Sequence, residues 1–586
     1  MEDIYIPKEL GFIPTEEQLE IVKQSINRQC LKIDALAGSS KTSTLVLVAN
    51  NLPVRSLYLA FNKTMCEEAK GKFPPHVKVR TSHSLAYREV GCEYQHKLTR
   101  PYGEYKNVLG TGSEIARAFR LAPFKVNKDK VITSAAMGHA IKSTVNNFEY
   151  SADRNISEKH VSLVEVKPYL HLKEFKLSEY RSKILKFAKK LWDKRKDICD
   201  DTLITHDTYM KIFQLSNPLL SDYEVIYLDE GQDSSMCVLD LFSRQTCKKI
   251  IVGDNLQSIY QFRKAINALQ KLDWSECKLT KSFRFGQDVA DIANGIALNE
   301  DMRVFINMKG YERKHTEVVE SLPSNIKDGV CYIYRTNAAL LEKSLELLEE
   351  GKKIAIHVDI TDFVSKVNSV VALMTGDKKN VKHADILIYN SWEDLKEDAS
   401  FQKGELQRIV KIVASGEHTR VLRLLKEYKP VKNPDVMLIT AHKSKGLEFN
   451  TVVIGDDFEP LCENEQTGKV EYVSDAERNL LYVACTRAIE LLVINNTIKQ
   501  ILNINGLWCE EEPEDVYNEG IEVNINEIVH IHPSRMEEGL SYLHDKLSNT
   551  EHAWEAQDQM DEHGFDNEEY DNAYNVDDSL RLMPSV

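Results

Sequence analysis

The stretch IDALAGSSKTSTL, residues 33–45, decides how the rest of the sequence is interpreted. An apolar run enters a turn of small residues, and a helix-like segment, TSTLVLVANN, follows Lys41. The generic phosphate-binding loop reads G-x-x-x-x-G-K-[ST], and its two glycine positions are here Ala35 and Ser40. The pattern predicts a nucleotide site in which Ser40 needs a backbone conformation that a residue with a side chain can adopt.

In a loop of this kind, backbone N–H groups and the helix N-terminus surround the phosphates. Lys41 is expected at the β- and γ-phosphate oxygens, and Thr42 at Mg²⁺. The other residues of the expected cradle are Ala37, Gly38, Ser39, Ser40 and Ser43. The alternative interpretation is a small-residue turn in front of a core helix.

Two further patterns suit phosphoryl transfer. VIYLDEGQD, 225–233, ends an apolar run in adjacent carboxylates, so Asp229 can hold Mg²⁺ through water while Glu230 orients an attacking water. VGDNLQSIYQFRKA, 252–265, offers Gln257 as a sensor of the γ-phosphate. A strand that ends in a solvated acidic turn is the alternative for the first of these, and a phosphate loop upstream argues against it.

Length and composition indicate about three or four domains of ~150 residues each. The 586 residues are 42% hydrophobic and 28% charged, and no run of about 18 apolar residues appears. The acidic, proline-interrupted start MEDIYIPKEL is unlike a signal peptide. Eleven cysteines without a C-x-x-C pair favour reduced thiols in a cytoplasmic protein over disulfides or a zinc site.

The net charge of −15 is concentrated at one end of the chain. Residues 551–586 hold eleven Asp and Glu against one Arg, and a nucleic-acid track elsewhere needs only local positive potential. We expect this acidic tail to be disordered. It is interpreted as a solvated tail, with two alternatives: a shield over a DNA groove, or a docking segment for a partner.

Apolar runs followed by polar residues predict eight strands, at 30–37, 55–61, 223–230, 248–254, 329–335, 436–440, 451–457 and 491–495. Helical patterns lie between them, which is typical of parallel sheets in α/β units. A lysine-rich helical stretch at about 90–205 and a smaller one at about 391–428 interrupt the alternation and are predicted to be insertions.

The segments AGSSKTSTL, YLAFNKTMCEEA, THDTYMKIFQLS and LTKSFRFGQDVA resemble superfamily 1 DNA helicases of the UvrD/Rep/PcrA type. Within that group the sequence is most similar to the F-box DNA helicase branch, without an F-box. The resemblance covers roughly residues 10 to 495, with about eight motifs in the family's order. It implies an α/β fold of two RecA-like domains, each with a helical insertion subdomain.

The resemblance also implies site residues. Gln18, in GFIPTEEQLEIV, is expected to read adenine and Phe283 to stack on it, with Glu448 near the ribose. Arg284 is expected at the γ-phosphate, and Arg487 as the arginine finger. The residues expected along single-stranded DNA are Phe61, Asn62, Lys63, His83, Tyr260, Phe262 and His442.

The expected domains follow from the motif order. The first RecA-like domain is expected at 1–89 and 206–278, interrupted by a helical subdomain at 90–205. The second is expected at 279–390 and 431–505, interrupted by a small helical insertion at 391–430. A C-terminal extension, 506–586, ends in the acidic tail.

The resemblance implies an ATP- and Mg²⁺-dependent DNA helicase that moves 3′→5′ on single strands, in replication, repair or recombination. Alternatives are a translocase that strips recombinase or other proteins from DNA, a helicase–nuclease, and a nucleotide-switched DNA-binding protein. Because every other nucleotide-contacting position is present, we expect Ser40 to be tolerated. Expected partners are single-stranded DNA, its junctions with duplex, and a single-strand-binding protein, polymerase or recombinase, with no membrane. The expected location is the cytoplasm, or the nucleoid of a bacterial or phage-infected cell.

Overall fold

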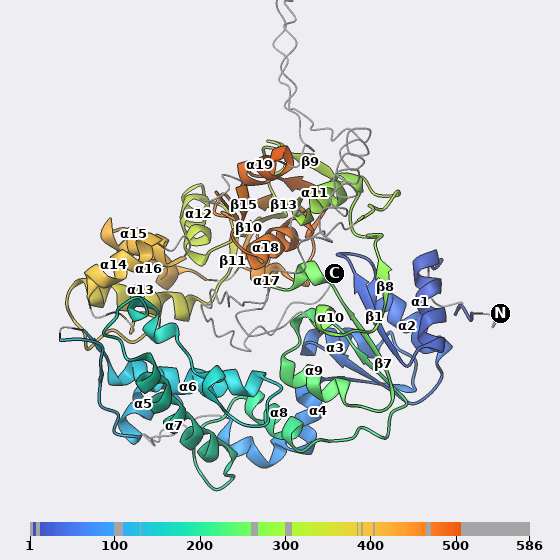
Figure 1. Ribbon diagram of the computed structural model, residues 1–586. Helices are drawn as coiled ribbons and strands as arrows, with labels where there is room; N and C mark the ends of the chain where they lie inside the picture. The colour runs from blue at the N-terminus through green and yellow to red at the C-terminus, as the bar shows by residue number, and fades with distance from the viewer. Residues whose placement is uncertain are drawn as a thin grey trace, which may run out of the picture.

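The computed structural model describes residues 4–7, 12–98, 109–128, 130–259, 268–298, 307–383, 385–387, 389, 391–401, 405–429, 431–463 and 470–504. Each of two domains is built on a sheet of six parallel strands, one at the right and one in the upper part of Figure 1. The strand order is β3-β2-β6-β7-β1-β8 in the first sheet and β11-β12-β10-β13-β16-β9 in the second. The predicted fold class, an α/β protein with two parallel-sheet domains, is confirmed.

The first sheet contains β1 (Cys30–Ala35), β2 (Ser56–Ala60), β3 (Val77–Thr81), β6 (Val225–Leu228), β7 (Lys248–Gly253) and β8 (Ser275–Leu279). The second contains β9 (Glu317–Val319), β10 (Val330–Tyr334), β11 (Ile354–His357), β12 (Val436–Thr440), β13 (Phe449–Ile454) and β16 (Ala488–Val493). Two antiparallel pairs lie outside the sheets: β4 (Phe124–Lys125) with β5 (Val131–Ile132), and β14 (Leu461–Glu463) with β15 (Val470–Tyr472).

The helices up to the end of the first sheet are α1 (Glu16–Asn27), α2 (Lys41–Asn51), α3 (Lys63–Lys70), α4 (Ser82–Glu89), α5 (Gly112–Ala118), α6 (Ser134–Tyr150), α7 (Leu177–Lys196), α8 (His206–Leu215), α9 (Met236–Ser243) and α10 (Ala268–Lys271). The later ones are α11 (Gln287–Ala297), α12 (Asn337–Glu349), α13 (Ile360–Met374), α14 (Trp392–Phe401), α15 (Glu405–Ala414), α16 (His418–Glu427), α17 (Ala441–Ser444), α18 (Asp475–Cys485) and α19 (Asn496–Ile504).

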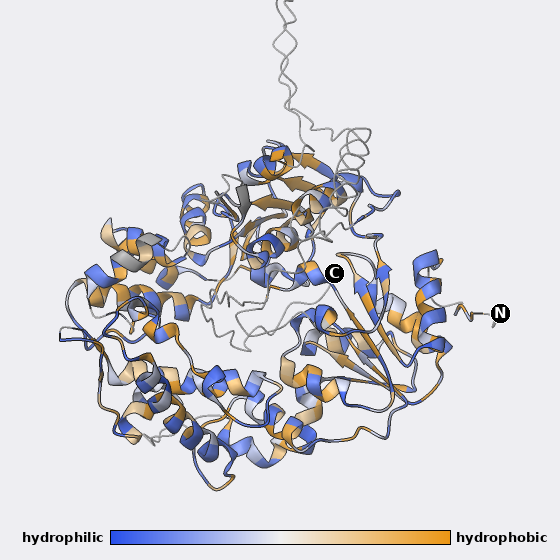
Figure 2. Ribbon diagram, in the orientation of Figure 1, coloured by the Kyte–Doolittle hydropathy of each residue, from blue (hydrophilic) through white to orange (hydrophobic). Residues whose placement is uncertain are grey.

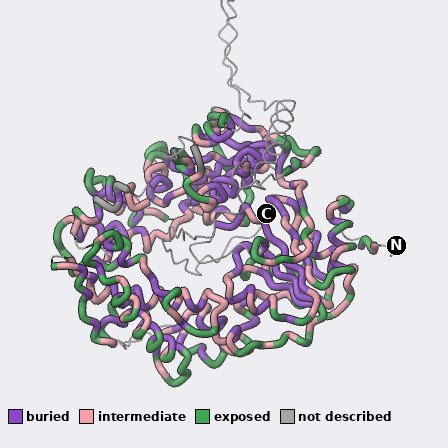
Figure 3. Tube along the Cα trace, viewed as in Figure 1, coloured by how far each residue is buried: buried purple, intermediate pink, exposed green. Residues whose placement is uncertain are grey.

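Helices cover both faces of each sheet. In β2, Leu57 and Leu59 pack with α4, α8 and α9, whereas Tyr58 and Ala60 pack with α1, α2 and α3. The second sheet lies between α11, α18 and α19 on one face and α12, α13, α15 and α16 on the other. The strands are accordingly hydrophobic in Figure 2 and buried in Figure 3, as expected for parallel strands covered on both faces.

The two domains share part of one hydrophobic core. Leu36 and Ala37, from the loop after β1, are buried in the same cluster as side chains of α11 and α18. Leu256 and Ile259, which follow β7, belong to that cluster as well. The segments after two strands of the first sheet are therefore packed against helices of the second domain.

All eight predicted strands are confirmed, and the four sheet strands that the sequence analysis missed are the four sheet edges: β3, β8, β9 and β11. An edge strand has a neighbour on one side only, so its sequence need not be continuously apolar. In β3 only Val77 is fully buried, and β8 buries only Leu279. Periodicity alone gives a weak signal for such segments.

The first helical insertion is a bundle of α5, α6 and α7 (Figure 1). Glycines bring α5 and α6 close together, because a Cβ on Gly112 would lie 2.7 Å from the backbone nitrogen of His139. The second insertion contributes α14, α15 and α16, which pack on α13 of the domain that carries it.

Several predictions concern parts of the chain that the structure does not describe. Tyr260, Phe262 and the acidic tail within 506–586 lie outside the described residues. Among the helices that are described, none combines the length and apolar character needed to cross a bilayer.

Candidate functional site

The predicted site residues follow the carboxyl ends of neighbouring strands. In the first sheet, β1 leads into the loop of residues 36–40, β6 into Asp229, and β7 into Asp254. These strands are adjacent, so the three segments meet at the carboxyl-terminal end of the sheet, where open α/β sheets bind ligands. The connection from β8 to α11 carries residues 280–286 to the same place.

The loop after β1 has two residues in the left-handed region. Gly38 has φ +74°, and a Cβ there would lie 2.9 Å from Cβ of Arg284. Ser40 has φ 60° and ψ 43°, and its carbonyl accepts a hydrogen bond from the N–H of Thr44 at 3.0 Å. A non-glycine residue in this conformation costs about 1–2 kcal/mol. The loop thus accommodates Ser40, but in a conformation that glycine adopts more easily.

Lys41 lies in a group of carboxylates. Its ammonium is 3.0 Å from Oε1 of Glu230. Burial by itself would lower the pKa of Lys41, but the negative charges of Glu230, Asp254 and Asp229 outweigh it and the pKa is raised. For Glu230, burial is again opposed, here by Lys41 and then Lys445, and its pKa is lowered. Both groups are therefore ionised at neutral pH.

Asp229 has the opposite shift. Burial, reinforced by the charge of Glu230, raises its pKa. Its carboxylate accepts hydrogen bonds from the hydroxyl of Tyr58 and, at 2.8 Å, from the N–H of Glu230. The Tyr58 hydroxyl also interacts with Thr42. The oxygens of Thr42 and Asp229 therefore converge on one point, and hard oxygen donors of this kind fit Mg²⁺.

The second domain closes directly over the loop. The N–H of Phe283 donates to the carbonyl of Gly38 at 2.8 Å. Arg284 donates to the carbonyl of Thr486 at 2.9 Å and lies 2.6 Å from Glu448. The structure thus brings the predicted γ-phosphate and ribose contacts, Arg284 and Glu448, together as an ion pair beside the loop.

Arg487 is almost completely buried at the end of α18. Its guanidinium donates to the carbonyls of Val483 and Leu447 and to the hydroxyl of Thr486 at 2.8–3.3 Å. Burial, together with the nearby charge of Arg284, lowers the pKa of Arg487 to about 9. Two cations that are buried close together favour an incoming anion.

Lys445 joins the two domains. It follows α17 in the second domain, and its ammonium donates to the carboxylate of Asp233 and to the carbonyl of Gln257 in the first domain. Burial raises the pKa of Asp233 to about 6 despite this partner. The amide of Gln257 donates to Asp254 at 2.7 Å. The predicted sensor, Gln257, is therefore held between Asp254 and a lysine of the opposite domain.

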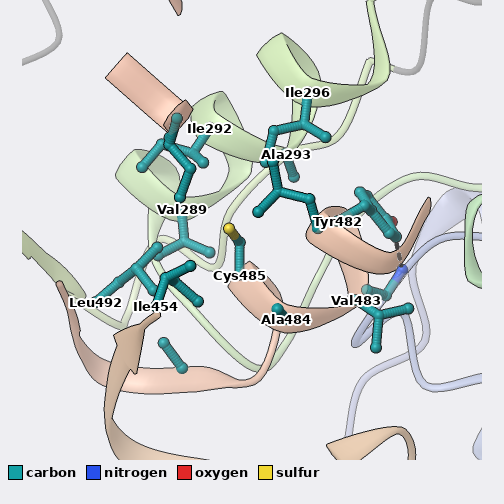
Figure 4. Packing of buried hydrophobic residues seen from close by; sticks show 14 of the residues in the cluster. Val289, Ile292, Ala293, Ile296, Ile454, Tyr482, Val483, Ala484, Cys485 and Leu492 are labelled. Carbon is teal, nitrogen blue, oxygen red and sulfur yellow. Dashed lines mark hydrogen bonds between the residues drawn. The ribbon is translucent and has the colours of Figure 1, made fainter. Parts of the chain in front are cut away.

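Tyr482 is a site residue that the sequence analysis missed. Its hydroxyl accepts from the N–H of Ala37 at 3.2 Å and donates to Asp254 at 3.3 Å. The side chain is fully buried, and Figure 4 shows it beside Val483 at the edge of the shared core. Asn479, one turn earlier in α18, donates to the carbonyl of Ser258 at 3.1 Å. Polar residues three apart in an apolar helix were the available signal.

Gln18 and Phe283, the two residues expected to contact the adenine base, both contact other side chains in the structure. Gln18 is buried, and both ends of its amide are used: it accepts from the N–H of Thr15 at 3.0 Å and donates to Thr44 at 2.9 Å. In the structure Gln18 caps α1 and ties it to α2, which leaves one N–H and one lone pair of its amide for adenine. Phe283 is half-buried and its ring lies 5.4 Å from that of Tyr311.

The residues expected to contact DNA follow the carboxyl ends of strands in the two sheets. Phe61, Asn62 and Lys63 follow β2, and His83 follows the paired strand β3. Asn62 and Lys63 are exposed, and the Asn62 side chain caps α3. His83 lies 3.0 Å from Asp207. His442, after β12 of the other sheet, has its pKa lowered to about 3 by burial, and then by nearby Arg335 and Lys445. It is therefore a neutral imidazole.

Several buried polar atoms at this site have no partner among the described residues. They include Oγ of Ser39 within the loop, Nε of Arg284 beside the loop, and Oδ1 of Asp233. Buried polar groups are rarely left unpaired, and such exceptions mark functional sites. A phosphate chain between the loop and Arg284 would satisfy the first two of these atoms. The residues present thus fit a magnesium-bound nucleotide.

Family comparisons agree with this geometry. The model of the UvrD/REP helicase N-terminal domain matches residues 15–273, and that of the UvrD-like helicase C-terminal domain matches residues 163–499. F-box DNA helicase 1 of Gallus gallus is 30% identical over 531 residues, 84% of this chain and 50% of that protein. F-box DNA helicase protein 1 of Schizosaccharomyces pombe is 30% identical over 541 residues, 83% of this chain and 58% of that protein.

Weaker similarity extends to bacterial proteins. Gabija protein GajB of Bacillus cereus is 26% identical over 332 residues, 47% of this chain and 64% of that protein. The chain spans 50% and 58% of the length of the two F-box DNA helicases that it matches.

Asp34 provides a test of the electrostatics of the site. Burial, reinforced by Asp254, raises the pKa of Asp34 to about 6. The unfolded value is about 3.9, so the folded state binds this proton more tightly and ionisation costs stability above pH 6. We expect Asp34→Asn to raise the free energy of unfolding by about 1–3 kcal/mol at pH 7.5, and by progressively less as the pH falls from 6 towards 4.

Urea titrations at several pH values would measure this gain. Asp222→Asn, which changes a carboxylate whose side chain is 72% exposed, is the control and should leave stability unchanged throughout. A loss at pH 7.5 would show that the buried charge of Asp34 is compensated, and a pH-independent gain would show that the gain does not come from that charge.

Proposed function

The chain belongs to the UvrD-like helicase family, and we propose that it is an ATP-dependent DNA helicase that moves 3′→5′ along single-stranded DNA. The observation that carries the proposal is a two-sided site: Lys41, Asp229 and Glu230 come from the first domain, and Arg284 and Arg487 from the second. Coupling hydrolysis to movement requires a site that is complete only when two domains are closed.

Lys41 and the loop amides bind the phosphates of ATP, the substrate. When bound, Mg²⁺ neutralises charge on the phosphate oxygens, and Thr42 and Asp229 would hold it. Glu230 orients the attacking water and is ionised, as that role requires. In the structure Glu230 pairs with Lys41, so binding of phosphate by Lys41 frees Glu230 for the water.

Arg284 and Arg487 sense the γ-phosphate from the second domain. Arginine suits this role because it stays charged and donates in a fixed planar geometry. Arg284 leaves Glu448, and Arg487 leaves the carbonyls at the end of α18, when the phosphate arrives. Loss of the γ-phosphate removes their shared anion and lets the domains separate.

The single-stranded DNA runs across the carboxyl-terminal ends of both sheets. It passes Phe61, Asn62, Lys63 and His83 of the first domain and His442 of the second. Lysine and asparagine contact the phosphodiester backbone while aromatic rings stack on bases. Opening and closing of the site then moves one domain along the strand. The 3′→5′ direction follows the family resemblance.

We further propose action on single strands and their junctions with duplex, in replication, repair or recombination, inside the cell. Docking of a single-strand-binding protein, polymerase or recombinase is part of this proposal. A translocase that strips recombinase and unwinds poorly uses the same site. Displacement of a recombinase filament at substoichiometric enzyme, without strand displacement, would favour that second function.

ATP hydrolysis with and without single-stranded DNA is the test. We expect strong stimulation by DNA in the wild type and loss of at least about 100-fold in Lys41→Ala, because the phosphate contact is removed. Strand displacement on 3′-tailed but not 5′-tailed duplex would then support the direction. Tight ATP binding without hydrolysis would contradict the proposal and favour a nucleotide-switched DNA-binding protein.

Tyr482→Phe tests the link between the domains. Without the hydroxyl, Ala37 and Asp254 lose their bridge, and we expect kcat for ATP to fall about tenfold while KM changes less than twofold. KM is spared because the phosphate contacts of the first domain remain.

Tyr472→Phe is the matched control. Its hydroxyl donates to the carbonyl of Ile296 within the second domain at 2.8 Å, so its removal should cost about 1 kcal/mol of stability and leave kcat unchanged. Equal effects of the two substitutions on kcat would argue that Tyr482 is only structural.

A further inference from the structure

Tyr58, in the middle of β2, carries a hydroxyl into a largely apolar core. The side chain is fully buried, and its ring lies 4.6 Å from that of Phe73. The surrounding cluster consists mainly of aliphatic and aromatic side chains from α1, α2, β1 and β6. Phenylalanine would fill the same space, and burying a hydroxyl costs free energy unless the hydroxyl is hydrogen-bonded. Packing therefore accounts for the ring of Tyr58 but not for its hydroxyl.

Both partners of this hydroxyl are proposed ligands of Mg²⁺. Asp229 accepts a hydrogen bond from it, and Thr42 is its second partner. A phenol has one proton to donate, and Asp229 accepts it, so the Thr42 hydroxyl is the donor in the second hydrogen bond. Burial, and then the charge of Asp229, raise the pKa of Tyr58, so the phenol keeps its proton. The two hydrogen bonds therefore run in one direction, from Thr42 through Tyr58 to Asp229.

This direction suits a metal site. A hydroxyl binds a cation through a lone pair, so its proton must point to an acceptor on another side, and for Thr42 that acceptor is the Tyr58 oxygen. The Tyr58 proton occupies one lone pair of Asp229 Oδ2, and the N–H of Glu230 occupies one of Oδ1 at 2.8 Å. Each carboxylate oxygen keeps a second lone pair for Mg²⁺ or for a water bound to it.

The backbone of β2 holds Asp229 as well. β2 and β6 are paired in parallel, and the N–H of Asp229 donates to the carbonyl of Leu59 at 3.1 Å. The next residue, Glu230, has φ 50°, in the left-handed region that is costly for a residue with a side chain. The Asp229 carboxylate is thus fixed from two sides, and Tyr58 is a side chain through which β2 reaches it.

We propose that Tyr58 is a positioning residue of the magnesium site, which holds the Thr42 hydroxyl and the Asp229 carboxylate in the orientations that bind Mg²⁺. This inference rests on the proposed ATP-dependent function and adds to it a residue that acts through two metal ligands. Substituting a residue that orients metal ligands typically costs about 10–100-fold in metal affinity. Loss of the Tyr58 hydroxyl should therefore weaken binding of magnesium-bound nucleotide and spare binding of nucleotide alone.

The test is the affinity of the full chain for a fluorescent, non-hydrolysable ATP analogue, measured with saturating Mg²⁺ and again in EDTA. In the wild type, Mg²⁺ should tighten binding. Tyr58→Phe keeps the ring and removes only the hydroxyl, and we expect Kd to rise about tenfold in Mg²⁺ and less than about twofold in EDTA. An equal change in both conditions, or no change in either, would overturn the proposal. Magnesium-independent binding by the wild type would overturn it too, because there would be no metal site to position.

Tyr227→Phe is the matched control. Tyr227 lies beside Tyr58 on the paired strand β6, is also fully buried, and has its ring 6.3 Å from that of Phe73. Its hydroxyl lies near Ser56, at the start of β2. This substitution removes a hydroxyl from the same core, and both Kd values should stay unchanged. A magnesium-specific rise equal to that of Tyr58→Phe would count against the proposal.

A double-mutant cycle with Asp229→Asn tests whether Tyr58 acts through the carboxylate. Effects of residues in contact are not additive. On the Asp229→Asn background, Tyr58→Phe should therefore raise Kd in Mg²⁺ by less than about threefold. A full tenfold rise on that background would show that Tyr58 acts independently of Asp229 and would overturn the proposal.

These binding measurements need neither hydrolysis nor DNA. Stimulation of wild-type ATP hydrolysis by single-stranded DNA tests the proposed helicase function separately. A wild type that binds magnesium-bound nucleotide without hydrolysing it would contradict the helicase proposal, while the comparison of Tyr58→Phe with Tyr227→Phe would still decide the role of Tyr58.

Discussion

Lys445 leaves the second domain and pairs with Asp233, a buried carboxylate of the first. Removing either partner would leave an uncompensated buried charge, which is costly. The same argument applies to the other buried carboxylates of the site. Asp229, Glu230 and Asp254 are balanced by Lys41 from their own domain and by Lys445 from the other. Lys445 therefore offsets buried negative charge of the first domain in the closed arrangement, where the carboxyl-terminal ends of the two sheets meet.

The sequence predicts the central strands of the two sheets better than the edge strands. Continuous apolar runs such as YEVIYLDE identify central strands, because a parallel strand with helices on both faces has no polar side. β8, with Glu276 and Lys278 exposed and Ser275 half-buried, has no such run, and only its pairing with β1 makes it a strand. Pairing with a neighbouring strand, which is a tertiary contact, decides which segments become edge strands. Local sequence patterns therefore do not reveal them.

The residues proposed to be catalytic were predictable for a different reason: their spacing within each motif reflects chemistry. Lys41, Asp229 and Glu230 meet as the loop and strand patterns imply. The sequence did not reveal which protein groups the other predicted site residues contact in this structure. Gln18 serves as a helix cap, and Arg487 is held by carbonyls of its own helix. Tyr482 links the loop to Asp254 across the domain interface, through contacts with residues 445 and 228 positions away that no local pattern encodes.

The most direct measurement of the central claim is a structure of the protein with single-stranded DNA, Mg²⁺, ADP and a fluoride mimic of the transferring phosphoryl group. A site completed by both domains predicts that Arg284 and Arg487 each donate to the mimic at about 3 Å, with Lys445 still on Asp233. Nucleotide held by the first domain alone, with Arg487 still donating to Val483, would contradict it.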